Sequence, residues 1–308
     1  KAGLSVEDVL NGAADATVAL AAAGGVELTT AAEIAANAMN VFALSAEDMP
    51  KIADLVAGAA NASAIDVADF AMSLQQSGAV ANLVGLDFED LALAITAMGN
   101  AGIKGSDAGT SIKTFLMRLE PSTAKSTSMM ERLGIITEET GNKFFDAAGN
   151  AKDMADISGV LADALAGQTR EQKLATLNTL FGSDAIRAAA VIADEGAAGF
   201  DKLGTALGSI SAAEIAEIRL DNLAGDMEKL SGSFETLLIT SGSLFTDVLR
   251  SLVQGATSLV DALAEIDGDD IADFMEPAAR FGRALADSWD DLYDAGVNVA
   301  EILGDLID

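Results

Sequence analysis

Leu86-Asp87-Phe88-Glu89-Asp90-Leu91 is the stretch that decides the fold of this chain. An apolar residue precedes an aspartate, and two acidic residues follow within one helical turn. The aspartate side chain can accept a hydrogen bond from a free amide at a helix start, and the two acids lie near the positive end of the helix dipole. The stretch therefore predicts a helix that begins beside Asp87.

The same pattern recurs upstream. The other three copies are Leu4-Ser5-Val6-Glu7-Asp8-Val9, Leu44-Ser45-Ala46-Glu47-Asp48-Met49 and Ile65-Asp66-Val67-Ala68-Asp69-Phe70. Thr29 or Thr30 supplies an additional helix start between the first two copies. A spacing near twenty residues fits one helix plus a turn, so residues 1–120 are predicted to form serial short helices paired as antiparallel hairpins. An internal repeat and the ordinary recurrence of capping chemistry both account for the pattern.

Composition supports an all-α fold. Half of the residues are hydrophobic, aromatic residues make up only 5%, and just three prolines interrupt 308 residues. Alanine dominates the apolar residues, and it is the best helix former. The chain begins with Lys1, which indicates a piece of a longer protein.

Charge and missing residue types exclude several functions. The chain has no cysteine and no histidine, which excludes disulfides, Ser-His-Asp triads and nearly all zinc chemistry. We predict no catalytic residue, no metal and no cofactor. A net charge of -30 repels nucleic acid, so no specific nucleic-acid binding is expected. Adaptation to concentrated salt is a second explanation of this charge.

No membrane span is expected in this segment. The longest uncharged run, between Asp69 and Asp87, contains several Ser, Gln and Asn residues and is too polar for a span of about 20 apolar residues.

A glycine-rich loop lies near the end of the serial helices. Residues 99–109 contain four glycines, and Ser106 or Asp107 is predicted to cap a helix that runs to Leu119. A lysine in a glycine loop suggests a phosphate cradle, but no Gly-Lys-Ser/Thr closes this loop and no strand precedes it. Phosphate binding is therefore not expected.

Residues 121–205 are predicted to form a small helical subdomain. The stretch from Phe144 to Lys152 is typical of a turn between two short extended pieces, so at most one tiny β-hairpin is expected near 143–153. Helices are expected at about 153–166, 169–181 and 183–193. Thr169 and Gln172 have the spacing of a capping box.

A heptad pattern marks residues 206–268. Its apolar positions alternate steps of three and four, with Ser241 as the one polar member of the first four repeats. The predicted oligomer seam comprises Leu220, Leu223, Met227, Leu230, Phe234, Leu237, Leu244, Val248, Leu252, Leu259 and Leu263. Its partner is either another helix of this chain or the same helix of sister chains. Glycines within 231–233 and 241–243 leave open one long helix or three shorter ones.

The last part, residues 269–308, is predicted to form acidic amphipathic helices. The aspartates of Asp267-Gly268-Asp269-Asp270 lack EF-hand spacing, so a capped helix start is expected there and not a calcium site. Trp289 and Tyr293, the single Trp and Tyr of the chain, are interpreted as a packing contact or a docking surface.

Three stretches, in this order, resemble the core region of phage tail tape-measure proteins. They are Ala101–Thr110 with the helix to Leu119, Leu180–Ala189, and Asn222–Met227 leading to Thr240. The serial helices and the Asp146–Asn150 turn also resemble that family, and the similarity spans about residues 3–265. The motif residues are Gly102, Gly105, Ser106, Gly109, Phe181 and Gly182.

The resemblance implies a structural protein of the virion, located in the tail lumen or tail tip. Such proteins set tail length during assembly, leave ahead of the genome, and contact tail-tube and tail-tip or baseplate proteins. A homo-oligomer, specifically a trimer, is also implied by the resemblance. Membrane-active segments and wall-degrading domains of the whole proteins are not visible here, so this segment is expected to be the compact part near a tail end.

Two other functions remain open from the residues alone. A carboxylate-based cell-wall hydrolase needs two acids about 5–10 Å apart in a cleft. With 48 acidic residues such pairs arise by chance, and Glu138 and Glu139 have no special setting. A generic helical scaffold or adaptor fits composition and periodicity equally well, and only the ordered motifs argue against it.

Overall fold

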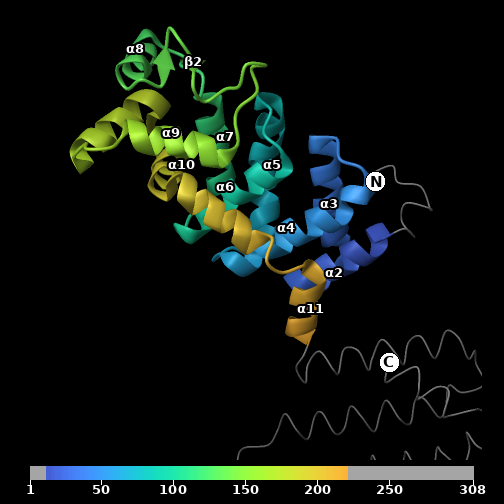
Figure 1. Ribbon diagram of the computed structural model, residues 1–308. Coiled ribbons are helices and arrows are strands. Elements are labelled where there is room, and N and C mark those ends of the chain that lie inside the picture. Colours follow the sequence, from blue (N-terminus) through green and yellow to red (C-terminus); the bar gives the residue numbers. More distant parts are fainter. Residues whose placement is uncertain (1–11, 221–308) are drawn as a thin grey trace, which may run out of the picture. The chain divides into compact units, whose positions relative to one another are not determined.

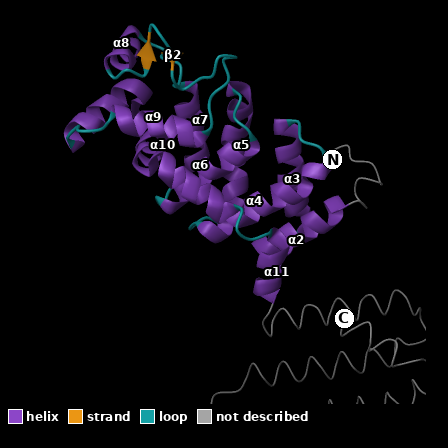
Figure 2. Ribbon diagram, in the orientation of Figure 1, coloured by secondary structure: helices purple, strands orange, loops and turns teal. Residues whose placement is uncertain are grey.

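The computed structural model describes residues 12–220, which belong to one compact unit. Within this part the all-α class is confirmed: helices make up the unit, and one two-stranded sheet lies at its edge beside α8 (Figures 1 and 2). Leu220 is the one seam residue in this range. The capped start at Leu4, the rest of the heptad seam and the stretch 269–308 lie outside the described residues. The predicted boundaries at 120/121 and 205/206 stay predictions.

The described elements follow one another with short connections. In chain order they are α2 (Ala14–Gly24), α3 (Leu28–Phe42), η2 (Ala46–Asp48), α4 (Met49–Ala62), α5 (Val67–Val84), α6 (Phe88–Asn100), α7 (Gly105–Met117), α8 (Ala124–Arg132), β1 (Ile136–Thr137), β2 (Gly141–Asn142), α9 (Met154–Ala164), α10 (Arg170–Leu207) and α11 (Ala212–Leu220).

The predicted caps start the predicted helices. Asp66 accepts the Asp69 amide at 2.7 Å, and Asp87 accepts the Asp90 amide at 2.8 Å. At η2 the Ser45 amide and hydroxyl donate to the Asp48 carboxylate. Each bond satisfies a polar group that the helix itself leaves free. A helix also begins in the region of Thr29 and Thr30, but neither threonine caps it, because α3 already begins at Leu28 after Glu27.

Consecutive helices do not pack as the predicted antiparallel hairpins. The chain turns by 117° between α2 and α3 and by 116° between α4 and α5. Alternate helices pack more extensively in most cases, namely α2 with α4, α4 with α6 and above all α5 with α7, although consecutive helices also touch. The hairpin prediction needs this correction because bends of 117° and 116° fall well short of the full reversal that an antiparallel hairpin requires. Helix α6 is consequently enclosed, with residues 91–99 all buried.

In the second half of the described unit, most of the predicted helix boundaries are found, and α10 extends further than predicted. Helix α9 and the capping box at Thr169, whose amide donates to Gln172 at 2.9 Å, are confirmed. Helix α10 is broken at Gly182 (φ 76°), where a boundary was expected. A further break at Gly196 (φ 62°) and the continuation to Leu207 were not expected.

The small sheet lies a few residues before the predicted position. Strands β1 and β2 pair antiparallel, with Ile136 opposite Asn142 and Thr137 opposite Gly141. The predicted turn at 143–153 forms a single bridge between Phe145 and Ala151. It is fixed by the Lys152 amide, which donates to the Phe144 carbonyl at 2.9 Å.

Helix α11 joins the end of the described unit to its beginning. The Arg219 guanidinium donates to the Ala23 carbonyl at 2.7 Å, at the negative end of α2. The Ala212 amide donates to Asp54 of α4 at 2.7 Å. These contacts hold the last described helix against α2 and α4 (Figure 1).

Within residues 12–220, no individual helix has both the length and the apolar character needed to cross a membrane. Two bent pairs, α2 with α3 and η2–α4 with α5, meet the requirement only when their lengths are combined.

Candidate functional site

The two motif stretches within the described residues meet in space at helix α7, which packs against α5 on one side and α10 on another (Figure 1). We call this meeting point the α5–α7–α10 junction. It comprises Ser73 of α5, Gly105, Gly109, Ser111 and Phe115 of α7, and Phe181 and Asp184 of α10.

Helices α5 and α7 approach each other unusually closely. A Cβ atom on Gly109 would lie 2.5 Å from the Ser73 carbonyl oxygen and 2.8 Å from its Cα, so only glycine fits. The buried Ser73 hydroxyl donates to the Gly105 carbonyl at 2.7 Å. The small residues of both helices therefore allow backbone contact and one buried hydrogen bond across the crossing.

Helix α10 reaches the same helix from residues about seventy positions further along the chain. The rings of Phe115 and Phe181 have centroids 4.9 Å apart and are both fully buried. The Ser111 hydroxyl donates to the Asp184 carbonyl at 3.0 Å, just after the break at Gly182. The break at Gly182 thus lies between the two α10 residues, Phe181 and Asp184, that contact α7.

The remaining motif residues lie outside this packing. Gly102 (φ 78°) is exposed in the loop before α7, where its left-handed backbone favours glycine. Ser106 is exposed in the first turn, and the prediction that Ser106 or Asp107 caps α7 is wrong. The helix begins earlier, at Gly105, after Lys104. The Lys104 ammonium donates to the Ala64 carbonyl and so ties this loop to the end of α4.

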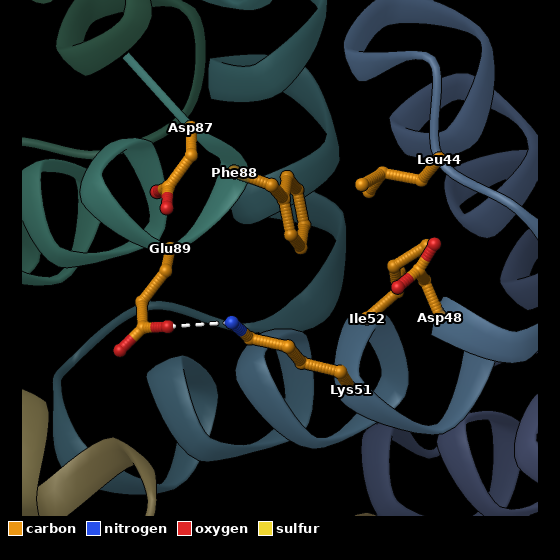
Figure 3. A pocket seen from close by; sticks show the side chains of 7 residues that line it. All are labelled: Leu44, Asp48, Lys51, Ile52, Asp87, Phe88 and Glu89. Atoms are coloured by element: carbon orange, nitrogen blue, oxygen red, sulfur yellow. Dashed lines mark ion pairs between the residues drawn. The ribbon is translucent and has the colours of Figure 1, made fainter.

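A small pocket lies between α4 and α6. Figure 3 shows Lys51 and Glu89 pointing toward each other across it, with Nζ and Oε2 2.7 Å apart. The hydrogen bond to Glu89 raises the pKa of Lys51 above its ordinary value, so the amine stays protonated. The pocket holds about 90 Å³. A protonated, paired lysine is a poor nucleophile, so we interpret the Lys51–Glu89 pair as a structural contact between α4 and α6.

A larger pocket of about 390 Å³ lies where α6, α9 and α10 meet. We call it the acidic cavity. Its walls include the apolar side chains of Leu93 and Phe200 and five carboxylates, from Asp87, Glu89, Asp90, Asp153 and Asp201. Sequence reasoning missed this gathering, because the acids come from segments far apart in the chain.

Asp90 is the unusual member of the acidic cavity. Burial raises its pKa to about 7, and the neighbouring Asp87, Asp153 and Glu89 add to the rise. The Met154 amide, which donates to Asp90 at 2.8 Å, opposes it. Asp90 therefore ties the start of α9 to α6 while its charge is only marginally tolerated at neutral pH.

Groups of three or more side chains able to ligate a metal do not occur in residues 12–220. Glu138 and Glu139 are exposed beside the strands. Of the predicted seam, the one described residue, Leu220, is half-buried at the end of α11.

The described fold and its junction define a helical packing unit, of the kind that structural proteins use. Residues 1–182 match the family of phage-related minor tail proteins, and the chain belongs to that family. The match ends at the α10 break, so it includes the junction residues up to Phe181 and leaves out the third motif at 222–240.

Two tape-measure proteins are similar to this chain. The tape measure protein of Pneumococcus phage Dp-1 is 32% identical over 174 residues, which are 56% of this chain and 14% of that protein. The probable tape measure protein of Escherichia phage P2 is 30% identical over 174 residues, which are 54% of this chain and 20% of that protein. The matched stretch is thus a small part of either relative. No solved structure matches the chain.

Proposed function

We propose that this chain is the compact helical segment of a tail tape-measure protein, packed in the tail tube or tail tip of a long-tailed virus. The observation that carries the proposal is the similarity to two such proteins over 174 residues, within a family match of residues 1–182. In this role the whole protein takes part in tail assembly, length determination and genome delivery, and the segment serves as a folded end.

Length determination is tested in the full-length protein. An in-frame deletion within its extended helical part shortens the tail by about 1.5 Å for each residue removed, the rise of an α-helix. Tail lengths are measured by electron microscopy of purified particles. Tails of unchanged length would refute the measuring role.

The compact segment has a separate test. Gly109→Leu in the full-length protein places a side chain into the backbone of α5, so we expect few or no assembled tails. The matched control is Leu174→Ala, because Leu174 is 62% exposed on α10. Normal assembly with Gly109→Leu would show that the folded segment is dispensable.

Self-association and contacts with tail-tube and tail-tip or baseplate proteins are the finer part of the proposal. The heptad pattern from Leu220 to Leu263 supports pairing of parallel copies, with a trimer as the expected state. Sedimentation of the chain at molar salt, which screens its charge, measures the oligomer. A clean monomer at high concentration would contradict pairing between copies.

The acidic surface supports a passive role toward DNA. A net charge of -30 leaves passing DNA unbound, so electrophoretic mobility of a duplex should be unchanged by the chain. An enzymatic role is the competing proposal, since the acidic cavity gathers five carboxylates and burial raises the pKa of one of them, Asp90, to about 7. Clearing of a peptidoglycan suspension by the chain, abolished by Asp90→Asn, would establish that alternative.

A further inference from the structure

A groove of about 660 Å³ lies where the end of α5, the segment after α7 and the β2 turn meet. We call it the α5–β2 groove. Its apolar wall consists of Leu83, Val84 and Phe145, and its charged wall consists of Glu120 and Asp146. It lies apart from the α5–α7–α10 junction and the acidic cavity, whose residues it does not share.

Leu83 is the feature that calls for an explanation. Its side chain is 82% exposed, the highest value among the exposed large hydrophobic side chains of residues 12–220. Val84 and Phe145 beside it are half-buried and continue into the core. A leucine at the rim of a groove with an apolar floor is the arrangement that buries an incoming apolar side chain.

The groove is held in shape before anything binds. The Ala151 amide donates to the Val84 carbonyl at 2.6 Å, which fastens the 145–151 turn to the end of α5. The Asn142 side chain donates to the Leu119 carbonyl at 2.9 Å and to Glu120 at 3.3 Å. Such preorganised walls reduce the entropy that binding costs.

The charge of the groove indicates which kind of segment binds there. Both ionisable side chains that line the groove are acidic, and no lysine or arginine lines it. Backbone amides of the turn hold the pKa of Asp146 below its ordinary value, so this carboxylate is ionised at neutral pH. Across the whole chain 48 acidic residues outnumber 18 basic ones, so another protein is the better source of a cation beside an apolar side chain.

We propose that the α5–β2 groove is a docking site for a segment of another protein that carries an apolar side chain next to lysine or arginine. The apolar side chain packs against Leu83 and Phe145, and the cation lies between Glu120 and Asp146. This inference goes beyond the proposed function, because it concerns the recognition chemistry of one surface and holds whatever assembly the chain serves.

The test measures binding of a short fluorescein-labelled peptide of lysine and leucine to the 308-residue chain by fluorescence anisotropy. Counterpart peptides carry glutamate for lysine or alanine for leucine. We expect Leu83→Asp and Glu120→Lys each to weaken binding of the lysine–leucine peptide about tenfold. We expect the unaltered chain to bind each counterpart peptide at least about tenfold more weakly than it binds the lysine–leucine peptide. Circular dichroism melts confirm that the variants, both altered at exposed positions, are folded.

The controls separate the groove from the overall charge. Leu174→Asp and Glu131→Lys make the same changes at other exposed positions and should leave binding unchanged. Equal losses in control and groove variants would overturn the proposal, as would equal binding of the lysine–alanine peptide. Self-association of the chain that Leu83→Asp abolishes would also overturn it, because the groove would then hold a second copy.

Discussion

Asp90→Asn should make the described unit more stable at neutral pH, although it removes a hydrogen-bonded carboxylate. The asparagine carbonyl oxygen can still accept the Met154 amide, now bound at 2.8 Å. The substitution removes a charge that burial and three neighbouring acids disfavour. It therefore keeps the tie between α6 and α9 and eliminates its electrostatic cost.

The pH dependence of this effect follows from the raised pKa of Asp90. Below about 3.8 the carboxyl is protonated in both the folded and unfolded chain and costs nothing. Between 3.8 and about 7 the folded state holds the proton more tightly, so stability falls as pH rises. Above about 7 both states are ionised and the full cost is present.

The size of the stability change follows from the difference between the pKa of Asp90 in the folded and in the unfolded chain. At about 1.4 kcal/mol for each pH unit, the rise of the Asp90 pKa from 3.8 to about 7 sets an upper bound of about 4 kcal/mol. Asp90 is partly exposed, and solvent screens part of this energy. We expect Asp90→Asn to raise the free energy of unfolding by about 2 kcal/mol at pH 8 and by little at pH 4.

Urea denaturation of the two proteins from pH 4 to pH 8 measures this directly, since urea adds no ionic screening. Glu138→Gln is the matched control, because it removes one exposed carboxylate from the same highly charged chain. The reasoning fails if the gain of Asp90→Asn over Glu138→Gln is the same at both ends of the range. It also fails if Asp90→Asn is the less stable protein at pH 8.

Other changes test the packing, capping and charge of the chain. Gly109→Ala should lower the free energy of unfolding by about 2 to 3 kcal/mol, because the added methyl group overpacks against α5. Gly204→Ala, whose methyl group meets only one atom at 4.0 Å, should instead stabilise α10 by up to about 1 kcal/mol. Equal melting temperatures of the two variants would refute the close crossing of α5 and α7. Asp66→Ala should cost about 1 kcal/mol in urea denaturation through loss of the α5 cap, and no loss would show that the cap is dispensable. The melting temperature should rise from low to molar salt, since screening relieves a charge of -30, and a temperature indifferent to salt would exclude adaptation to it.

The parts of this fold that sequence reasoning could predict are local. Asp66, Asp87 and Thr169 cap their helices through partners three residues away, so the sequence alone contains both members of each bond. The break at Gly182 is equally local, because it needs a left-handed backbone that glycine adopts readily. Chemistry within one turn of helix is enough for such features.

The choice of helix partners depends on residues far apart and was not predicted. Ser73 and Ser77 on α5 and Gly105 and Gly109 on α7 each stand four positions apart, so each pair lies on one helix face. These small residues were a signal for a close crossing, which the capping pattern obscured. The acidic cavity offered no such signal, because Asp90 and Asp153 are brought together only by the packing of α9 on α6.

The α5–α7–α10 junction also explains what the family resemblance consists of. Among the motif residues, Gly109 touches the backbone of α5, the Gly105 carbonyl accepts the Ser73 hydroxyl, and the Phe181 ring packs on Phe115 in the core. Catalytic side chains usually gather around a cleft with ionisable groups. Here the acidic cavity is the place with such groups, and none of the motif residues lines it. In the structure these motif residues therefore serve the packing of three helices.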